Sequence, residues 1–279
     1  MIHHTASMAL GLRAAVSCIL GVSTLSTGAL AAVDNLSSPF VYATAGFTSN
    51  GTDKVDEKSN SAGPVVTNIF GGAAAARANF GSGGYKYPSA TGEDAYWGFS
   101  MWSDGFKILG SPGNGTLTFS VSIYGNASGQ WDQGYSLFVS DNPFSLQATI
   151  AEMYAVTANC LPDTSCGYDF QLTGATRVTS RLVNNGDQPA NVVLSGFLPF
   201  TYGATFYLLG TFGGDGSTPA NFYNSATLGI TAPGGSSLQN LSNSVYASAV
   251  PEPSTLFFAI AGVILVATKR YSTLRCGEA

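Results

Sequence analysis

Alternation of apolar and hydroxyl side chains constrains the fold of this chain more than any other feature. In the segment 116–124, serine and threonine hydroxyls alternate with four apolar side chains, Leu117, Phe119, Val121 and Ile123. This period-two pattern predicts a β-strand with one buried face. Asn114-Gly115, directly before it, is a strong turn signal. Further strands are predicted at 135–140, 177–183, 191–197, 205–212 and 226–231.

Glycine-rich breakers separate these strands at 81–84, 213–216 and 233–235, and Asn184–Asp187 has the composition of a hairpin turn. Ala73–Arg77 is compatible with a short helix, but its glycine flanks favour an extended segment. No strong amphipathic helix of ordinary length is expected between residues 32 and 249, and no fixed-period repeat suggests a solenoid. We therefore predict an all-β chain whose residues 32–249 form a single, jelly-roll-like β-sandwich.

The N-terminus has the features of an export signal. Arg13 precedes an apolar or small run, and Ala29 and Ala31 form an A-x-A cleavage pattern. We expect residues 1–31 to be a signal peptide, handled by the Sec translocon and signal peptidase. A weaker alternative is lipidation of Cys18, although the apolar run continues well beyond it.

The C-terminus combines a rigid breaker, a short apolar segment and a basic stop. The breaker is Val250-Pro251-Glu252-Pro253-Ser254, the uncharged run continues to residue 268, and Lys269-Arg270 ends it. Prolines exclude a helix before Ser254, and the run is shorter than the roughly 20 residues of a full membrane span. It is expected to be a short transmembrane helix, either a permanent anchor or a segment that a membrane protease removes, followed by a cytoplasmic tail at 271–279.

Residues 250–270 resemble the PEP-CTERM sorting signal of Gram-negative bacteria that make exopolysaccharide, a tail that is also labelled an ice-binding-protein C-terminal motif. The resemblance implies recognition by an exosortase, a membrane cysteine transpeptidase, and removal of the signal at its Pro-Glu-Pro region. It also implies transient contact with the inner membrane before delivery to the cell surface, the matrix or the medium. The segment 221–235 resembles the last strands of many PEP-CTERM passenger domains, which carry no known activity.

The charge balance limits the binding partners. Residues 32–249 contain fourteen Asp and Glu against seven Lys and Arg, a net charge of −7. Nucleic acid requires cationic partners, as do anionic membrane surfaces, so neither is expected to bind this domain.

Cys160 and Cys166 are the only cysteines between residues 32 and 249. Outside the cytoplasm we expect them to form a disulfide across a small loop. Two thiols without a neighbouring histidine make a poor zinc site, and their spacing is wider than the redox Cys-x-x-Cys motif.

The only histidines, His3 and His4, lie in the predicted signal peptide. The exported domain therefore lacks the residue on which Ser-His-Asp and Cys-His catalysis depend. Glu93, Asp94 and Asp104 leave a carboxylate hydrolase as a remote alternative. An exposed sugar-binding face is a stronger alternative, because aromatic rings stack on sugars and carboxylates accept hydroxyl hydrogen bonds; its candidate residues are Trp97, Trp102, Trp131 and Asp132.

No cofactor or metal is expected, with one qualification for a structural calcium ion. Asp53, Asp56 and Glu57 form one candidate oxygen-rich loop and Gly214-Asp215-Gly216 another, although neither matches the EF-hand pattern. The sequence thus predicts a non-catalytic exported protein of the cell envelope or exopolysaccharide matrix, with a carbohydrate-binding module as the alternative.

Overall fold

The computed structural model describes residues 36–49, 52–91, 94–127, 133–158, 171–182, 189–216, 218–223 and 226–249. The predicted signal peptide, the sorting signal, Cys160 and Cys166 lie outside these ranges. The elements are β1 (Phe40–Ser49), β2 (Thr52–Asn60), β3 (Val65–Ile69), η2 (Phe70–Gly72), β4 (Ala74–Asn79), β5 (Ser82–Tyr87), β6 (Ala95–Leu109), β7 (Asn114–Ala127), β8 (Gln133–Ser140), α2 (Leu146–Ala158), β9 (Thr176–Leu182), β10 (Pro189–Thr201), β11 (Thr205–Gly216), β12 (Ala220–Asn221), β13 (Ala226–Thr231) and β14 (Ser237–Asn240).

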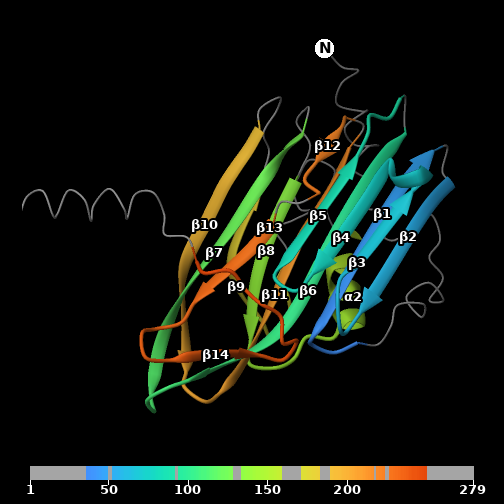
Figure 1. Ribbon diagram of the computed structural model, residues 1–279. Helices are drawn as coiled ribbons and strands as arrows, with labels where there is room; N and C mark the ends of the chain where they lie inside the picture. The colour runs from blue at the N-terminus through green and yellow to red at the C-terminus, as the bar shows by residue number, and fades with distance from the viewer. Residues whose placement is uncertain are drawn as a thin grey trace, which may run out of the picture.

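The strands form two antiparallel sheets (Figure 1). The first sheet has the order β2-β1-β6-β11-β8-β9, with β14 beside β6. The second has the order β10-β7-β12-β5-β4-β3, with β13 beside β5 and β7. The prediction of an all-β fold is therefore confirmed at the level of two antiparallel sheets. Of the six strands predicted from the sequence, five lie within the bounds of an observed strand, and the sixth, 177–183, is shifted by one residue from β9. Ala74–Arg77 is extended, as part of β4, and Ala73 lies just before the strand with helical backbone angles. A jelly-roll-like chain path remains a prediction.

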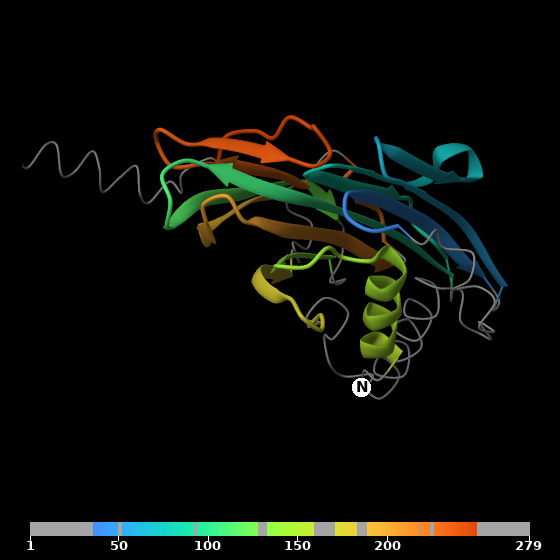
Figure 2. The same cartoon turned by 90° about the horizontal axis from the view of Figure 1, so that it is seen from below.

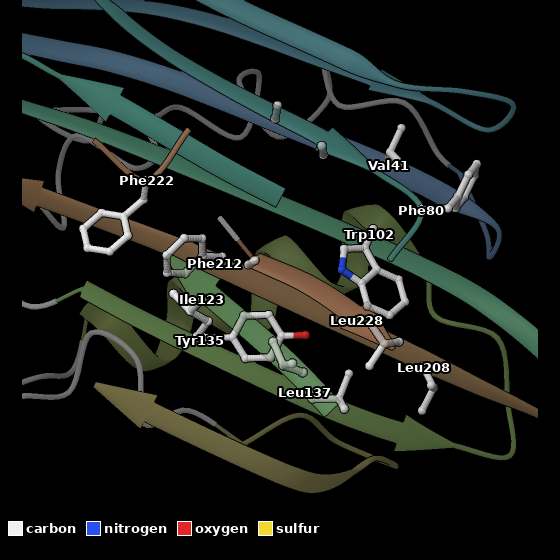
Figure 3. Close-up of a cluster of buried hydrophobic side chains, with 14 of the residues drawn as sticks. Val41, Phe80, Trp102, Ile123, Tyr135, Leu137, Leu208, Phe212, Phe222 and Leu228 are labelled. Carbon is white, nitrogen blue, oxygen red and sulfur yellow. The ribbon is translucent and has the colours of Figure 1, made fainter. Parts of the chain in front are cut away.

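The main core lies between the two sheets. The apolar residues of the alternating segment face inward from β7, and they pack with residues of both sheets, including Trp102 and Phe106 of β6. Figure 3 shows Trp102 among Val41, Leu208 and Leu228, which come from three different strands. Because the period of the strand is two, the hydroxyls of the same segment are directed to the outer surface of the second sheet.

A second apolar cluster covers the opposite face of the first sheet. It joins Phe99 and Met101 of β6 to Leu146 and Ile150 of α2, and Figure 2 shows α2 lying against this side of the sheets. Only a strongly amphipathic helix was excluded between residues 32 and 249, and the 13-residue helix α2 was not predicted from the sequence. Ser145 accepts a 3.3 Å hydrogen bond from the amide of Ala148, which is the side-chain cap that starts a helix.

No helix in the described part of the chain has both the length and the apolar character needed to cross a membrane.

The last described segment, residues 237–249, connects both sheets and is called the C-terminal strap below. Its first part, β14, pairs with β6 of the first sheet, and the amide of Leu241 donates to the carbonyl of Gly105 at 2.9 Å. Its last part lies along β13 of the second sheet, where the amide of Ile230 donates to the carbonyl of Ala247 at 2.8 Å. The strap therefore closes one side of the sandwich.

Candidate functional site

Two of the predicted sugar-binding residues are buried in the protein interior. Trp97 is 0% exposed and Trp102 is 2% exposed. They lie at odd and even positions of β6, so their rings point to opposite faces of the first sheet, and both of these faces carry a packed apolar cluster. The prediction that they form an exposed aromatic face is wrong for these two residues. Trp131 and Asp132 lie outside the described residues.

Asp104 is fully buried, and its carboxylate is held by four hydrogen bonds from other residues of the chain. Its Oδ1 accepts hydrogen bonds from the amides of Gly105 at 2.9 Å and Ser242 at 3.1 Å. Its Oδ2 accepts from the hydroxyls of Ser242 at 2.5 Å and Tyr246 at 2.8 Å. Burial raises the pKa of this carboxyl, and the four hydrogen bonds act in the opposite direction. The strap surrounds both oxygens, so Asp104 holds the strap and does not face a substrate; Glu93 lies outside the described residues.

The candidate calcium residues do not form a loop. Asp53, Asp56 and Glu57 belong to strand β2, in which neighbouring side chains point to opposite faces. Asp56 already accepts a 2.7 Å hydrogen bond from the amide of Asn68 and lies 3.5 Å from Nζ of Lys58. Asp215 lies on β11 and is 8% exposed. Among the described residues, no three His, Cys, Asp or Glu side chains are grouped to bind a metal ion.

An uncharged surface on the second sheet is the strongest candidate for a binding site. Strand β7 lies between β10 and β13 (Figure 1). None of the 13, 14 and 6 residues of β10, β7 and β13 carries a charge, although the chain as a whole has a net charge of −5. The outer surface of these three strands is called the neutral face below.

Hydroxyls and two exposed aromatic rings line the neutral face. Along β7 the outward positions alternate with the core positions and are Thr116, Thr118, Ser120, Ser122 and Tyr124, of which Ser120 is only 2% exposed. In the β7–β10 register they lie opposite Pro199, Phe197, Ser195, Val193 and Asn191, respectively. Tyr124 is 51% exposed and Phe197 is 73% exposed. Their positions differ by six residues along the strand direction, which is about 20 Å.

This arrangement is suited to binding. Aromatic rings offer flat apolar surfaces, and serine and threonine hydroxyls both donate and accept hydrogen bonds. The three strands of the face contain no Asp, Glu, His, Cys, Lys or Arg. The hydroxyl row was evident from the alternation in 116–124, but the exposure of Tyr124 and Phe197 was not, since an aromatic in a strand is usually part of the core.

The comparisons with known proteins do not assign a family. No protein-family model matches the chain, and no curated protein matches it significantly. Among solved structures, an Arthrobacter globiformis T6 isomalto-dextranase complexed with panose aligns with 65% of this chain at 13% identity, with a TM-score of 0.21. The aligned region spans only 26% of that enzyme.

Proposed function

We propose that this chain is an exported, non-catalytic protein of the cell envelope or exopolysaccharide matrix. The support is the order of its C-terminal features. The strap ends at Ala249, whose amide donates a 2.9 Å hydrogen bond to Oγ1 of Thr231, and Val250-Pro251-Glu252-Pro253 follows directly in the sequence. After export by the Sec translocon and cleavage by signal peptidase, a membrane-bound exosortase would therefore find its motif next to a folded domain. The short apolar helix holds the precursor in the inner membrane until this step.

Intact-mass analysis of the protein from cells with and without an exosortase tests the sorting step. We expect loss of the segment after the Pro-Glu-Pro motif only when the exosortase is present. A variant with Glu252→Ala is the matched control, because it alters the motif and leaves residues 32–249 unchanged; it should keep its tail in both strains. A wild-type tail that remains complete through Ala279 in exosortase-containing cells would instead indicate a permanent anchor.

The domain itself has a carbohydrate-binding role in our proposal, and the neutral face supports this second candidate function. Its rings can stack on the C–H surfaces of sugars, and the hydroxyls of Ser122 and Ser195, which lie between Tyr124 and Phe197, can exchange hydrogen bonds with sugar hydroxyls. A spacing of about 20 Å suits an extended polysaccharide that spans several sugar units. The absence of charge on β7, β10 and β13 favours a neutral polysaccharide over an acidic one.

A glycan array, followed by titration of the best polysaccharide, tests the binding site. Tyr124→Ala should weaken binding at least about fivefold, since loss of one stacking ring removes about 1 kcal/mol. Phe70→Ala is the matched control, because Phe70 is a comparably exposed ring, 47%, outside the neutral face. Binding should also change little with salt, since charge–charge attraction does not contribute. Equal effects of the two substitutions, or no binding to any polysaccharide, would refute this role.

A further inference from the structure

The four edge strands of the two sheets differ sharply in charge. At the edges of the first sheet, β2 contains five charged residues and β9 contains Arg177 and Arg181. At the edges of the second sheet, β3 has only five residues, whereas β10 has 13 residues and no charge. Soluble proteins usually protect a long sheet edge with charges, because free backbone groups pair readily with another strand. Among these described edges, β10 is the one that is both long and uncharged.

The free hydrogen-bonding groups of β10 belong to its odd-numbered residues. Proline has no N–H and so tolerates only positions whose nitrogen faces away from the neighbouring strand; Pro189 and Pro199 are both odd-numbered. Consistently, the amide of Tyr202, just beyond the strand, donates to the carbonyl of Gly113 beside β7 at 2.9 Å. The amides of Asn191, Val193, Ser195 and Phe197 therefore point away from β7.

We infer that β10 pairs with β10 of a second copy of this chain, antiparallel, about a two-fold axis at Ser195. In this register Ser195 lies opposite itself, Val193 opposite Phe197, and Asn191 opposite Pro199. All four outward amides of each copy then find a carbonyl, and among the paired residues only the carbonyl of Asn191 lacks a donor from the other copy, because Pro199 has no N–H. The second sheets of the two copies become one continuous sheet.

Side chains and charge support the same register. The side chains of odd-numbered β10 residues lie on the neutral face, so Phe197, which is 73% exposed, packs beside Val193 of the second copy. Two copies of an acidic chain repel each other through most of their surfaces. At β10 no charge is brought together, whereas self-pairing of β2 or β9 would place like charges close to one another. This inference does not depend on the proposed sorting or sugar binding.

Sedimentation of the exported protein over a range of concentrations tests the inference. We expect a reversible dimer. Val193→Lys should raise its dissociation constant at least about tenfold, because two equivalent ammonium groups enter the interface and displace the contact with Phe197. Tyr124→Ala, on the neighbouring strand, should leave the dimer intact, which separates dimerisation from sugar binding. A strictly monomeric wild type, or a dimer unaffected by Val193→Lys, would overturn the inference.

A cysteine at the two-fold axis tests the register itself. Directly opposed residues of a hydrogen-bonded antiparallel pair have Cα atoms about 5.5 Å apart, which is within the range that a disulfide spans. Ser195→Cys should therefore give a disulfide-linked dimer on mild oxidation. Ser180→Cys, an exposed serine on the edge strand β9, is the matched control and should cross-link no more than the wild type. Equal cross-linking of the two variants would exclude the β10 register.

Discussion

The phenol of Tyr246 donates a 2.8 Å hydrogen bond to Oδ2 of Asp104, a residue 142 positions earlier in the chain. The Tyr246 ring also packs edge-on against Phe106, with centroids 5.0 Å apart. Burial is the main reason that the pKa of Tyr246 lies far above its ordinary value, so the phenol is a neutral donor at any physiological pH. One side chain of the strap thus joins the apolar core and a buried carboxylate.

Tyr246→Phe should lower the free energy of unfolding by about 1.5–2 kcal/mol. The substitution retains the ring and removes a hydrogen bond to a charged acceptor. Urea unfolding of the exported protein measures the difference. Tyr124→Phe is the control, because it removes a hydroxyl from a ring that is 51% exposed and should change stability by less than about 0.5 kcal/mol. Equal stability of wild type and Tyr246→Phe would show that the strap does not depend on this bond.

The carboxyl of Asp104 makes the stability of the strap depend on pH. Burial raises its pKa in the folded protein above the ordinary value. Such a group contributes stability that is complete below the unfolded pKa, about 3.9, and that is lost as pH rises through the folded pKa. Asp104→Asn has no titrating group at this position. The difference in unfolding free energy between wild type and Asp104→Asn should therefore shift in favour of wild type as pH falls from about 7 to about 4; parallel pH profiles would contradict this assignment.

Gly46 on β1 leaves the space that the indole of Trp97 occupies. The two residues are paired in the β1–β6 register, and a Cβ on Gly46 would lie 2.0 Å from the ring of Trp97. Gly46→Ala should therefore destabilise the protein by about 3 kcal/mol through overpacking. At Gly63 the nearest atom to an added Cβ is 4.0 Å away, so Gly63→Ala should have an effect below about 0.5 kcal/mol. Similar midpoints for both variants in thermal unfolding would refute the close packing of Trp97.

The sequence located strands most clearly where apolar and polar side chains alternate. β7 is the clearest case, since its two faces differ in polarity at every step. β6 was not predicted, because both of its faces are covered and its sequence, from Ala95 to Leu109, shows no clear alternation. The prediction of an exposed sugar-binding face rested on the acidic residues near Trp97 and Trp102 in the sequence, which do not reveal that both rings are buried.

Contacts between residues far apart in the sequence account for the remaining differences between the predicted and the observed structure. Asp104 finds its partners 138 and 142 residues later in the chain, and no local pattern connects these positions. The neutral face was only partly evident, because the hydroxyls of β7 appear in the alternation, whereas the edge position of β10 depends on the order of strands in the sheet. The charge-free composition of 189–201 was available from the sequence and is a useful signal for such an edge.

The helix α2 escaped prediction because its sequence is apolar around most of its circumference, and short apolar runs do not distinguish helix from strand. Ile150 of α2 is 4% exposed and packs in the cluster on the first sheet. Ile150→Ala should therefore lower the free energy of unfolding by about 2–4 kcal/mol, as expected for a large-to-small change in a packed core. Ala148→Ser, at an exposed position of the same helix, should cost less than about 1 kcal/mol through helix propensity alone. Denaturant titration measures the free energy of unfolding of both variants. A small effect of Ile150→Ala would show that α2 contributes little to holding the first sheet in place.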